Sequence, residues 1–172
     1  PQTTRHRILG INTDGNRQCI FVDTPGLHAE QGKALNRVMN ETVVAVISDV
    51  DVILFLVDQL NFNSGDEQVL NLLKKVDVPV LLVINKVDLL ADKTRLLPHI
   101  QSLAARHEFA EIVPLSALSG HNMDTLQTLV AEYLPEGPFL YPEDQVTDRS
   151  SRFLAAELIR EKVTRQLGDE LP

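Results

Sequence analysis

Two short polar motifs, each placed directly after an apolar run, constrain this chain more than any other feature. Residues 85–88 read Asn-Lys-Val-Asp after the apolar run 80–84, and residues 23–26 read Asp-Thr-Pro-Gly after the apolar run 20–22. Ligands of open α/β sheets bind in the crevice beyond the carboxyl ends of the strands. The two motifs therefore predict a nucleotide site at such an edge, where one motif contacts the base and the other lies near the phosphates.

The motif Asn85-Lys86-Val87-Asp88 has the chemistry needed to discriminate between purines. Guanine presents its N1–H and its exocyclic amine side by side, so the Asp88 carboxylate can accept both hydrogen bonds, whereas adenine lacks this pair of donors. We expect Asn85 to bind the base or the neighbouring backbone, and the aliphatic stem of Lys86 to lie along apolar or ring surface. The motif thus predicts a preference for GTP over ATP.

A third segment, Ser116-Ala117-Leu118, follows the strand-like residues 112–115. By itself this segment is a weak signal. Because it follows residues 85–88 after an intervening helical pattern, we interpret it as the loop whose backbone N–H groups reach the carbonyl of the base.

The motif Asp23-Thr24-Pro25-Gly26 fits a role at the phosphates. In nucleoside triphosphatases of the phosphate-loop type, an aspartate at this strand end holds Mg²⁺, usually through water, and a following glycine lets its backbone N–H approach the γ-phosphate. The alternative is an ordinary turn after a strand, for which all four residue types are common. The presence of residues 85–88 in the same chain favours the first interpretation, with Asp23 at the magnesium ion and Gly26 at the γ-phosphate.

The sequence contains no Gly-x-x-x-x-Gly-Lys-Ser/Thr run, the loop whose backbone N–H groups and lysine bind phosphates in such proteins. Residues 1–7 stand where a switch threonine is expected. We therefore expect the chain to be an internal fragment of a longer protein, lacking roughly 35 to 45 residues of strand, phosphate loop and helix before residue 1. Such a fragment is expected to be inactive by itself.

Composition narrows the possible functions further. The chain has 172 residues, 44% of them hydrophobic, and a formal net charge of −8, so it can form a sizeable core but is a poor nucleic-acid binder by itself. The single cysteine, Cys19, excludes an internal disulfide and is expected to be a small buried residue of a strand. The histidines show no pair at metal-ligand spacing; they are His6, His28, His99, His107 and His121.

Periodicity predicts an α/β fold with a mostly parallel, doubly wound sheet. Residues 8–11 and 18–22 flank the hairpin signal Asp14-Gly15 and are expected to pair as antiparallel strands. Further strands are expected at residues 52–57, 80–84 and 112–115, the first of them covered on both faces. Helical spacing is found within residues 35–50, 69–76, 96–104 and 123–130, and Ser64 with Glu67 is expected to cap the second of these helices.

A change of composition at residues 135–146, rich in proline, predicts a linker between a first domain, residues 1–134, and the start of a second, residues 147–172. A further helix is expected to begin near Thr147-Asp148. Its apolar positions lie on one face and are Phe153, Ala156, Ile159, Val163 and Leu167. Such a face requires a partner, which could be a further domain, the first domain or another chain.

Taken together, these segments resemble the bacterial Era GTPases over essentially the whole chain. The segments that carry the resemblance are Gln2-Thr3-Thr4-Arg5-His6-Arg7, Asp23 to His28, Asn85 to Asp88, Ser116-Ala117, Thr147-Asp148-Arg149, Arg152-Phe153, Ile159 to Lys162 and Glu170-Leu171-Pro172. The resemblance implies a phosphate-loop GTPase domain, truncated at its N-terminus, followed by the first helix of a KH-type RNA-binding domain. It also implies a cytoplasmic protein, peripherally associated with the inner membrane, that hydrolyses GTP to GDP and acts in assembly of the 30S subunit through ribosomal RNA.

The resemblance assigns further site residues. It implies that Thr4, in preference to Thr3, senses Mg²⁺ and the γ-phosphate. Ras-like GTPases carry a glutamine after the glycine of the second motif, where it orients the attacking water, but this chain has Leu27. Because leucine has no hydrogen-bonding group, we expect slow intrinsic hydrolysis unless another group compensates, and the catalytic residue stays unassigned.

Two classes of function therefore stay open. The first is a GTP-hydrolysing switch with Mg²⁺ as its cofactor, of which this chain is a part. The alternative is a nucleotide-free interaction module that retains the GTPase fold. In either case, the apolar face of the tail helix and the sheet surface that a missing first strand and helix would cover need burial. We expect the fragment to self-associate, to exchange its tail helix with a neighbour, or to leave residues 1–7 and the linker mobile.

Overall fold

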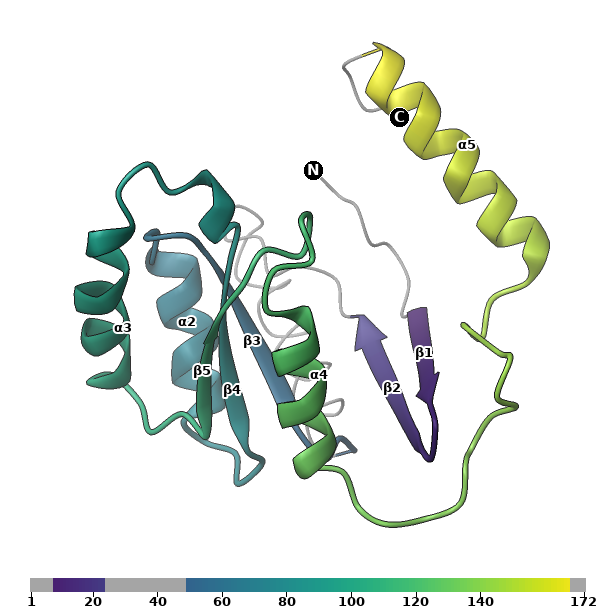
Figure 1. Cartoon of the computed structure of the whole chain (residues 1–172), viewed down its shortest axis with the longest axis horizontal. Coiled ribbons are helices and arrows are strands. Elements are labelled where there is room, and N and C mark those ends of the chain that lie inside the picture. Colours follow the sequence, from purple (N-terminus) through teal and green to yellow (C-terminus); the bar gives the residue numbers. More distant parts are fainter. Residues whose placement is uncertain (1–7, 24–48, 168–172) are drawn as a thin grey trace, which may run out of the picture. The chain divides into compact units, whose positions relative to one another are not determined.

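The computed structural model describes residues 8–23 and 49–167, and these belong to two compact units (Figure 1). The hairpin unit comprises Pro1–Gly26 and Gly137–Pro172, and the sheet unit comprises Leu27–Glu136. The helix expected within residues 35–50 lies, for all but its last two positions, outside the described residues.

Three parallel strands form the centre of the sheet unit: β3 (Ile53–Asp58), β4 (Val80–Asn85) and β5 (Glu111–Pro114). They pair in the order β3-β4-β5. The register places Asp58, the last residue of β3, opposite Asn85, the last residue of β4. The sequence prediction of a parallel sheet with strands in these three places is confirmed, and the polar strand ends meet at one edge of the sheet.

Helices cover both faces of this sheet (Figure 1). Helices α2 (Ser64–Leu73) and α3 (Leu96–Ala104) connect successive strands and pack on one face, where Leu70, Leu73 and Leu103 join the side chains of β3 and β4 in one core cluster. Helix α4 (Met123–Glu132) follows β5 and covers the other face with Leu126 and Val130. The middle strand β4 is consequently buried from Val80 to Ile84, and full burial of each large apolar side chain contributes about 1.5–3 kcal/mol.

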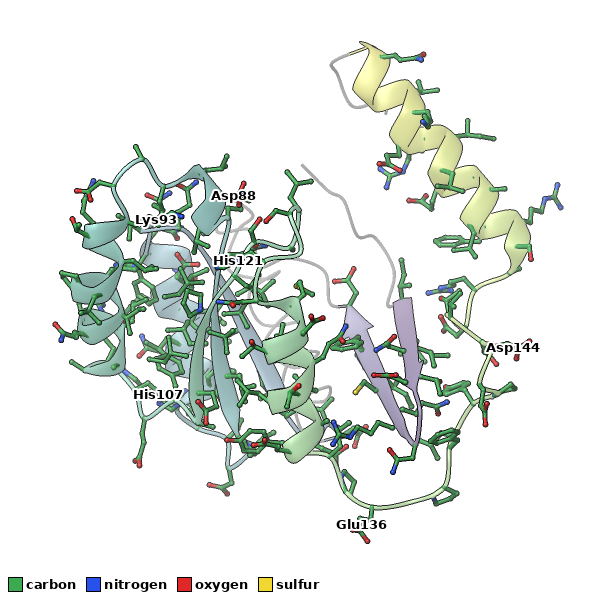
Figure 2. The ribbon with its side chains drawn as sticks, in the orientation of Figure 1. Asp88, Lys93, His107, His121, Glu136 and Asp144 are labelled. Carbon is green, nitrogen blue, oxygen red and sulfur yellow. The ribbon has the colours of Figure 1, made fainter. Side chains whose placement is uncertain are left out.

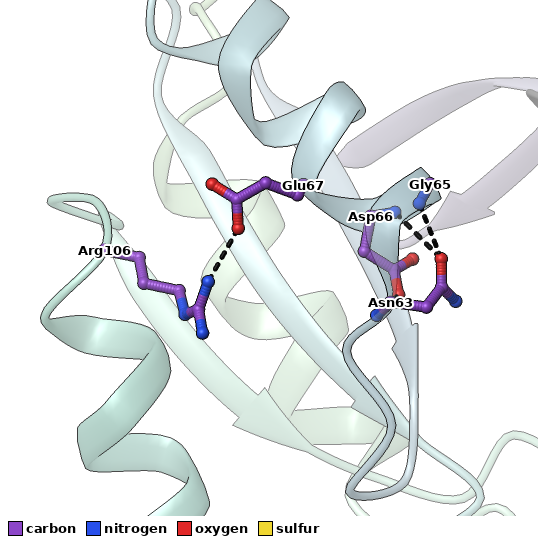
Figure 3. Close-up of polar contacts among 5 residues, drawn as sticks. All are labelled: Asn63, Gly65, Asp66, Glu67 and Arg106. Carbon is purple, nitrogen blue, oxygen red and sulfur yellow. Dashed lines mark hydrogen bonds and ion pairs between the residues drawn. The ribbon is translucent and has the colours of Figure 1, made fainter.

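Two expectations for this unit are wrong in detail. Leu56 of β3 is 55% exposed, because no described element covers the face to which it points, so β3 is not covered on both faces throughout. The cap of α2 is formed by Asn63 with Asp66, instead of Ser64 with Glu67 (Figure 3). Asparagine is as good an N-cap as serine and stands one residue earlier.

The cap of α2 is a reciprocal set of hydrogen bonds (Figure 3). Asn63 Oδ1 accepts from the backbone N–H groups of Gly65 (2.7 Å) and Asp66 (3.3 Å), and Asp66 Oδ2 accepts from the N–H of Asn63 (2.8 Å). The shift of the cap leaves Glu67 available to pair with Arg106 Nη1 at 2.6 Å. This ion pair joins α2 to the segment that follows α3.

The hairpin unit contains the expected antiparallel strands, β1 (Ile8–Asp14) and β2 (Arg17–Asp23). Gly15 in the connecting turn has a φ of 58°, a left-handed conformation that glycine adopts without steric cost. Cys19 is buried, as expected, and burial raises the pKa of its thiol although nearby Arg17 acts in the opposite direction.

Residues 140–148 are hydrogen-bonded to the hairpin. Gln18 Oε1 accepts from the N–H groups of Leu140 (2.9 Å) and Tyr141 (3.0 Å), and Gln18 Nε2 donates to the Tyr141 carbonyl (2.9 Å). The N–H of Ile11 donates to the Val146 carbonyl at 2.9 Å. The side chain of Gln18 therefore satisfies backbone hydrogen-bonding groups of Leu140 and Tyr141, as the backbone of a paired strand would.

The last helix, α5 (Ser151–Leu167), begins later than the predicted start at Thr147-Asp148. Thr147 forms a bridge with Gly10, and the Asp148 carboxylate accepts from the N–H of Leu9 at 3.1 Å, so both residues are bound to β1. Ile159, one of the apolar positions of α5, is 65% exposed, and the predicted partner for this face stays a prediction. No helix among the described residues is both long and apolar enough to cross a bilayer.

We predict that Gln18→Ala releases residues 140–141 from the hairpin. The two N–H groups would lose their acceptor, and a loss of about 1–2 kcal/mol should speed their hydrogen exchange roughly fivefold to thirtyfold. Exchange measured by NMR on the 172-residue chain tests this, with Gln68→Ala, an exposed position on α2, as the matched control. Unchanged protection of Leu140 and Tyr141 in the Gln18 variant would contradict the assignment.

Candidate functional site

The loop after β4 is held in an unusual conformation. Lys86 directly follows the last residue of the strand and adopts a left-handed backbone with a φ of 61°, a conformation that costs a non-glycine residue about 1–3 kcal/mol. The turn continues into a 3₁₀ helix, η1 (Val87–Leu89), and the N–H of Val87 donates to the Leu115 carbonyl at 3.2 Å. The apolar side chain of Val87 is buried in the core, while Lys86 and Asp88 are exposed. Val87 therefore anchors the loop, and the side chains on either side of it face solvent.

Asn85 joins two loops through one side-chain oxygen. Its Oδ1 accepts from the N–H of Lys86 at 2.7 Å and from the N–H of Ala117 at 3.0 Å. The first bond stabilises the left-handed turn, and the second fixes the loop after β5 to the loop after β4. The structure therefore brings together the predicted segments 85–88 and 116–118, with Asn85 bound to neighbouring backbone, one of its two predicted roles.

The loop after β5 is ordered around Ser116. This serine is fully buried, its Oγ accepts from the N–H of Ser119 at 3.2 Å, and its own N–H donates to the His121 carbonyl at 3.1 Å. Leu118 is 92% exposed. The buried serine thus supports a short exposed turn whose backbone can face a ligand.

Asp88 lies at the same end of the sheet unit, beyond the carboxyl ends of the strands (Figure 2). Its carboxylate is exposed, and it makes no hydrogen bond or ion pair with any residue in the described part of the chain. A carboxylate that is held by a rigid loop and has free oxygens can accept two hydrogen bonds from adjacent donors. This is the chemistry that guanine recognition requires.

One polar residue at this edge was not predicted as a site residue. Asp58, the last residue of β3, places Oδ2 3.0 Å from Lys86 Nζ. The following residue, Gln59, also has a left-handed backbone (φ 50°), and its N–H donates to the Asn85 carbonyl at 2.9 Å. The position of Asp58 at the end of an apolar run, where β4 ends in Asn85, is the signal that could have identified it.

The residues predicted at the phosphates are placed only in part. Asp23 is the exposed last residue of β2, in the hairpin unit. Thr24, Pro25, Gly26 and Leu27 lie outside the described residues, as does Thr4. Their predicted roles stay predictions.

Comparison with known proteins adds independent findings. Residues 1–86 match the family described as 50S ribosome-binding GTPase. GTPase Era of Azotobacter vinelandii is 60% identical to the chain and GTPase Era of Yersinia enterocolitica is 52% identical, in each case over all 172 residues. The chain spans 57% of the length of each of these relatives.

Solved structures agree with the sequence relatives. The structure of Era in complex with MgGDPNP and nucleotides 1506-1542 of 16S ribosomal RNA matches with a TM-score of 0.82 at 42% identity, over 94% of this chain and 55% of that one. A variant of Aquifex aeolicus Era bound to GDP.AlF4- matches with the same TM-score and identity, over 95% of this chain and 56% of that one. The chain therefore belongs to the 50S ribosome-binding GTPase family, and over its whole length it is homologous to bacterial GTPase Era.

Proposed function

We propose that this chain belongs to a GTPase that binds GTP, hydrolyses it to GDP and phosphate, and acts in assembly of the small ribosomal subunit by binding its RNA. The observation that carries the proposal is the pair of hydrogen bonds, accepted by Asn85 Oδ1 from the N–H groups of Lys86 and Ala117, that joins the two candidate base loops. In this arrangement the Asp88 carboxylate and the turn at Ala117 and Leu118 are both exposed. The nucleotide-bound and RNA-bound states of the Era structures named above support the same function.

In this proposal the base loops select guanine. Asp88 accepts hydrogen bonds from the guanine N1–H and exocyclic amine, and the backbone N–H groups of residues 116–118 donate to the base carbonyl. The methylene stem of Lys86 lies along the ring, while Val87 anchors the loop in the core. Adenine presents no donor pair to Asp88, so ATP binds less well.

The phosphate end of the site is proposed from chemistry and homology. Asp23 offers an exposed carboxylate at a strand end, the hard oxygen ligand that Mg²⁺ prefers, directly or through water. Thr4 is proposed as the second magnesium-side residue, and Thr24, Pro25 and Gly26 as the turn that brings a backbone N–H to the γ-phosphate. When bound, Mg²⁺ would neutralise charge on the phosphate oxygens.

Hydrolysis transfers the γ-phosphoryl group to water and breaks its bond to the bridging oxygen of GDP. Leu27 stands where a glutamine would orient that water and has no group able to do so. We propose that this position leaves intrinsic hydrolysis slow, and that a partner, a cation or another residue supplies the missing function.

Partners and location follow the same proposal. Ribosomal RNA and the 30S subunit would bind through a KH-type domain that begins at residue 147, after the linker 135–146, with residues 1–134 as the GTPase domain. The acidic balance of the chain agrees with an RNA-binding surface elsewhere in the protein. We propose a cytoplasmic location, with peripheral association with the inner membrane.

The first test concerns the base. In the full-length protein that contains this chain, Asp88→Asn should shift preference from GTP toward xanthosine triphosphate, because an amide can donate to the extra carbonyl of xanthine that a carboxylate repels. Loss of a charge-assisted pair should lower GTP affinity at least tenfold, at about 1.5–3 kcal/mol per bond. Titration with both nucleotides measures this, and Asp66→Asn, at the cap of α2, is the control. Unchanged GTP affinity would exclude Asp88 from the base site.

The second test concerns the junction of the two loops. Asn85→Ala removes the acceptor of both N–H groups, so we expect faster hydrogen exchange at Ala117 and weaker GTP binding. Asn85→Asp keeps acceptor oxygens at the same position and should preserve the protection of Ala117. Equal exchange at Ala117 in the two variants would show that the hydrogen bond does not hold the loop.

The third test separates the switch from the nucleotide-free module. The 172-residue chain lacks the phosphate-loop lysine and N–H groups, and three such charge-assisted bonds, each worth about 1.5–3 kcal/mol, amount to a thousandfold loss or more. Calorimetry should therefore detect no tight GTP binding to this chain, whereas the full-length protein should bind. Submicromolar binding by the chain alone would refute the role given to the phosphate loop, and no binding by either would favour the module.

A further inference from the structure

The ion pair between Asp58 and Lys86 combines half-exposed side chains with one buried carboxylate oxygen. Asp58 Oδ2 lies 3.0 Å from Lys86 Nζ, with side chains 45% and 53% exposed, respectively. The other carboxylate oxygen, Oδ1, is inaccessible to solvent and has no hydrogen-bond partner among the described residues. Burial of an unpartnered carboxylate oxygen is unfavourable, so the orientation of Asp58 is imposed by its surroundings.

The backbone around the pair imposes that orientation. Asp58 pairs with Asn85 in the register of β3 and β4, and the N–H of Gln59 donates to the Asn85 carbonyl at 2.9 Å. Gln59 and Lys86 both leave their strands in a left-handed conformation. β3 and β4 are therefore each followed by a left-handed residue, and the Asp58 carboxylate lies against Lys86 in the neighbouring loop.

We infer that Asp58 is a positioning residue for guanine-nucleotide binding, which holds the Lys86 side chain in the orientation that the bound base requires. This inference rests on the function proposed above, because Lys86 must contact the nucleotide for its orientation to matter. Asp58 itself need not touch the nucleotide. Its contribution is made through the charge of its carboxylate.

The energetics of the Asp58–Lys86 pair favour a role in positioning the lysine over a role in folding stability. Ion pairs between half-exposed side chains add little to folding stability, since solvent screens them and both side chains lose freedom. A lysine has four rotatable bonds in its side chain, and a nucleotide that binds an unrestrained lysine must restrict them at the moment of binding. When Asp58 already restricts these bonds in the free protein, binding loses less conformational entropy, so the affinity for the nucleotide is higher.

The test uses the full-length protein that contains this chain and a fluorescent GDP as the probe. Asp58→Asn keeps the size of the side chain but removes its charge, and should raise the Kd for GDP about threefold to tenfold. Lys86→Met keeps the stem without the ammonium group, and in its presence Asp58→Asn should have no further effect. Asp58→Glu, which restores the carboxylate, should recover most of the wild-type affinity.

Two controls isolate the effect. Glu67→Gln removes a second ion pair among the described residues of the sheet unit, that of Glu67 (40% exposed) with Arg106 (45% exposed), and it should leave the Kd unchanged. Thermal melting of each variant identifies loss of folding, and Asp58→Ser replaces Asp58→Asn if the latter does not fold.

The outcomes are distinct. The inference would be overturned if Asp58→Asn and Lys86→Met raised the Kd by independent factors that multiply in the double variant. It would also be overturned if Asp58→Glu bound GDP as weakly as Asp58→Asn, or if the neutral variants at Asp58 bound GDP with wild-type affinity. If Asp88→Asn also leaves guanine-nucleotide affinity unchanged, the proposed function fails together with this inference. If Asp88→Asn has its predicted effect and the Asp58 variants do not, only the role of Asp58 is refuted.

Discussion

The candidate base site depends on one acceptor atom, Asn85 Oδ1. Two N–H groups from different loops converge on it, one from the residue that follows β4 and one from the turn after β5. A backbone carbonyl at this position could not serve both, because the strand geometry directs it into the sheet ladder. A side-chain amide at the strand end satisfies the left-handed turn and the neighbouring loop at once, and the exposed positions of Asp88 and Leu118 follow from that junction.

The rigidity of this junction comes from burial of the strand beneath it. Side chains from Val80 to Ile84 are buried on both faces, against α2 and α3 on one side and against α4 on the other. Since β4 is the middle strand, it is also hydrogen-bonded along both edges. The polar loop therefore extends from a strand that is buried and hydrogen-bonded on both sides, as precise placement of a carboxylate requires. The left-handed turn at Lys86 is tolerated because this support is strong.

Sequence patterns predicted the parts of the structure in which one interaction dominates. Apolar runs located β3, β4 and β5, and Asp14-Gly15 located the hairpin, because burial and turn geometry leave few alternatives there. The cap of α2 was placed one residue late because Asn63-Asp66 and Ser64-Glu67 satisfy the same pattern, and only the fold shows that Glu67 is paired with Arg106. Asp58 was missed although it ends an apolar run as Asn85 does, because its pairing with Lys86 depends on the register between two strands.

The start of α5 shows how a tertiary contact overrides a local signal. Prolines at residues 135, 138 and 142 indicate a linker, and the polar residues Thr147 and Asp148 resemble the beginning of a helix. In the fold, Thr147 bridges Gly10 and the Asp148 carboxylate accepts from the N–H of Leu9, so the helix begins only at Ser151. Gln18 Oε1 likewise binds residues 140 and 141 to the hairpin by accepting from their N–H groups, in a segment where prolines leave few backbone donors. The segment predicted as a linker is therefore bound to the hairpin by specific hydrogen bonds, and the proposed domain boundary at residue 147 falls among these bonds and not in unbound chain.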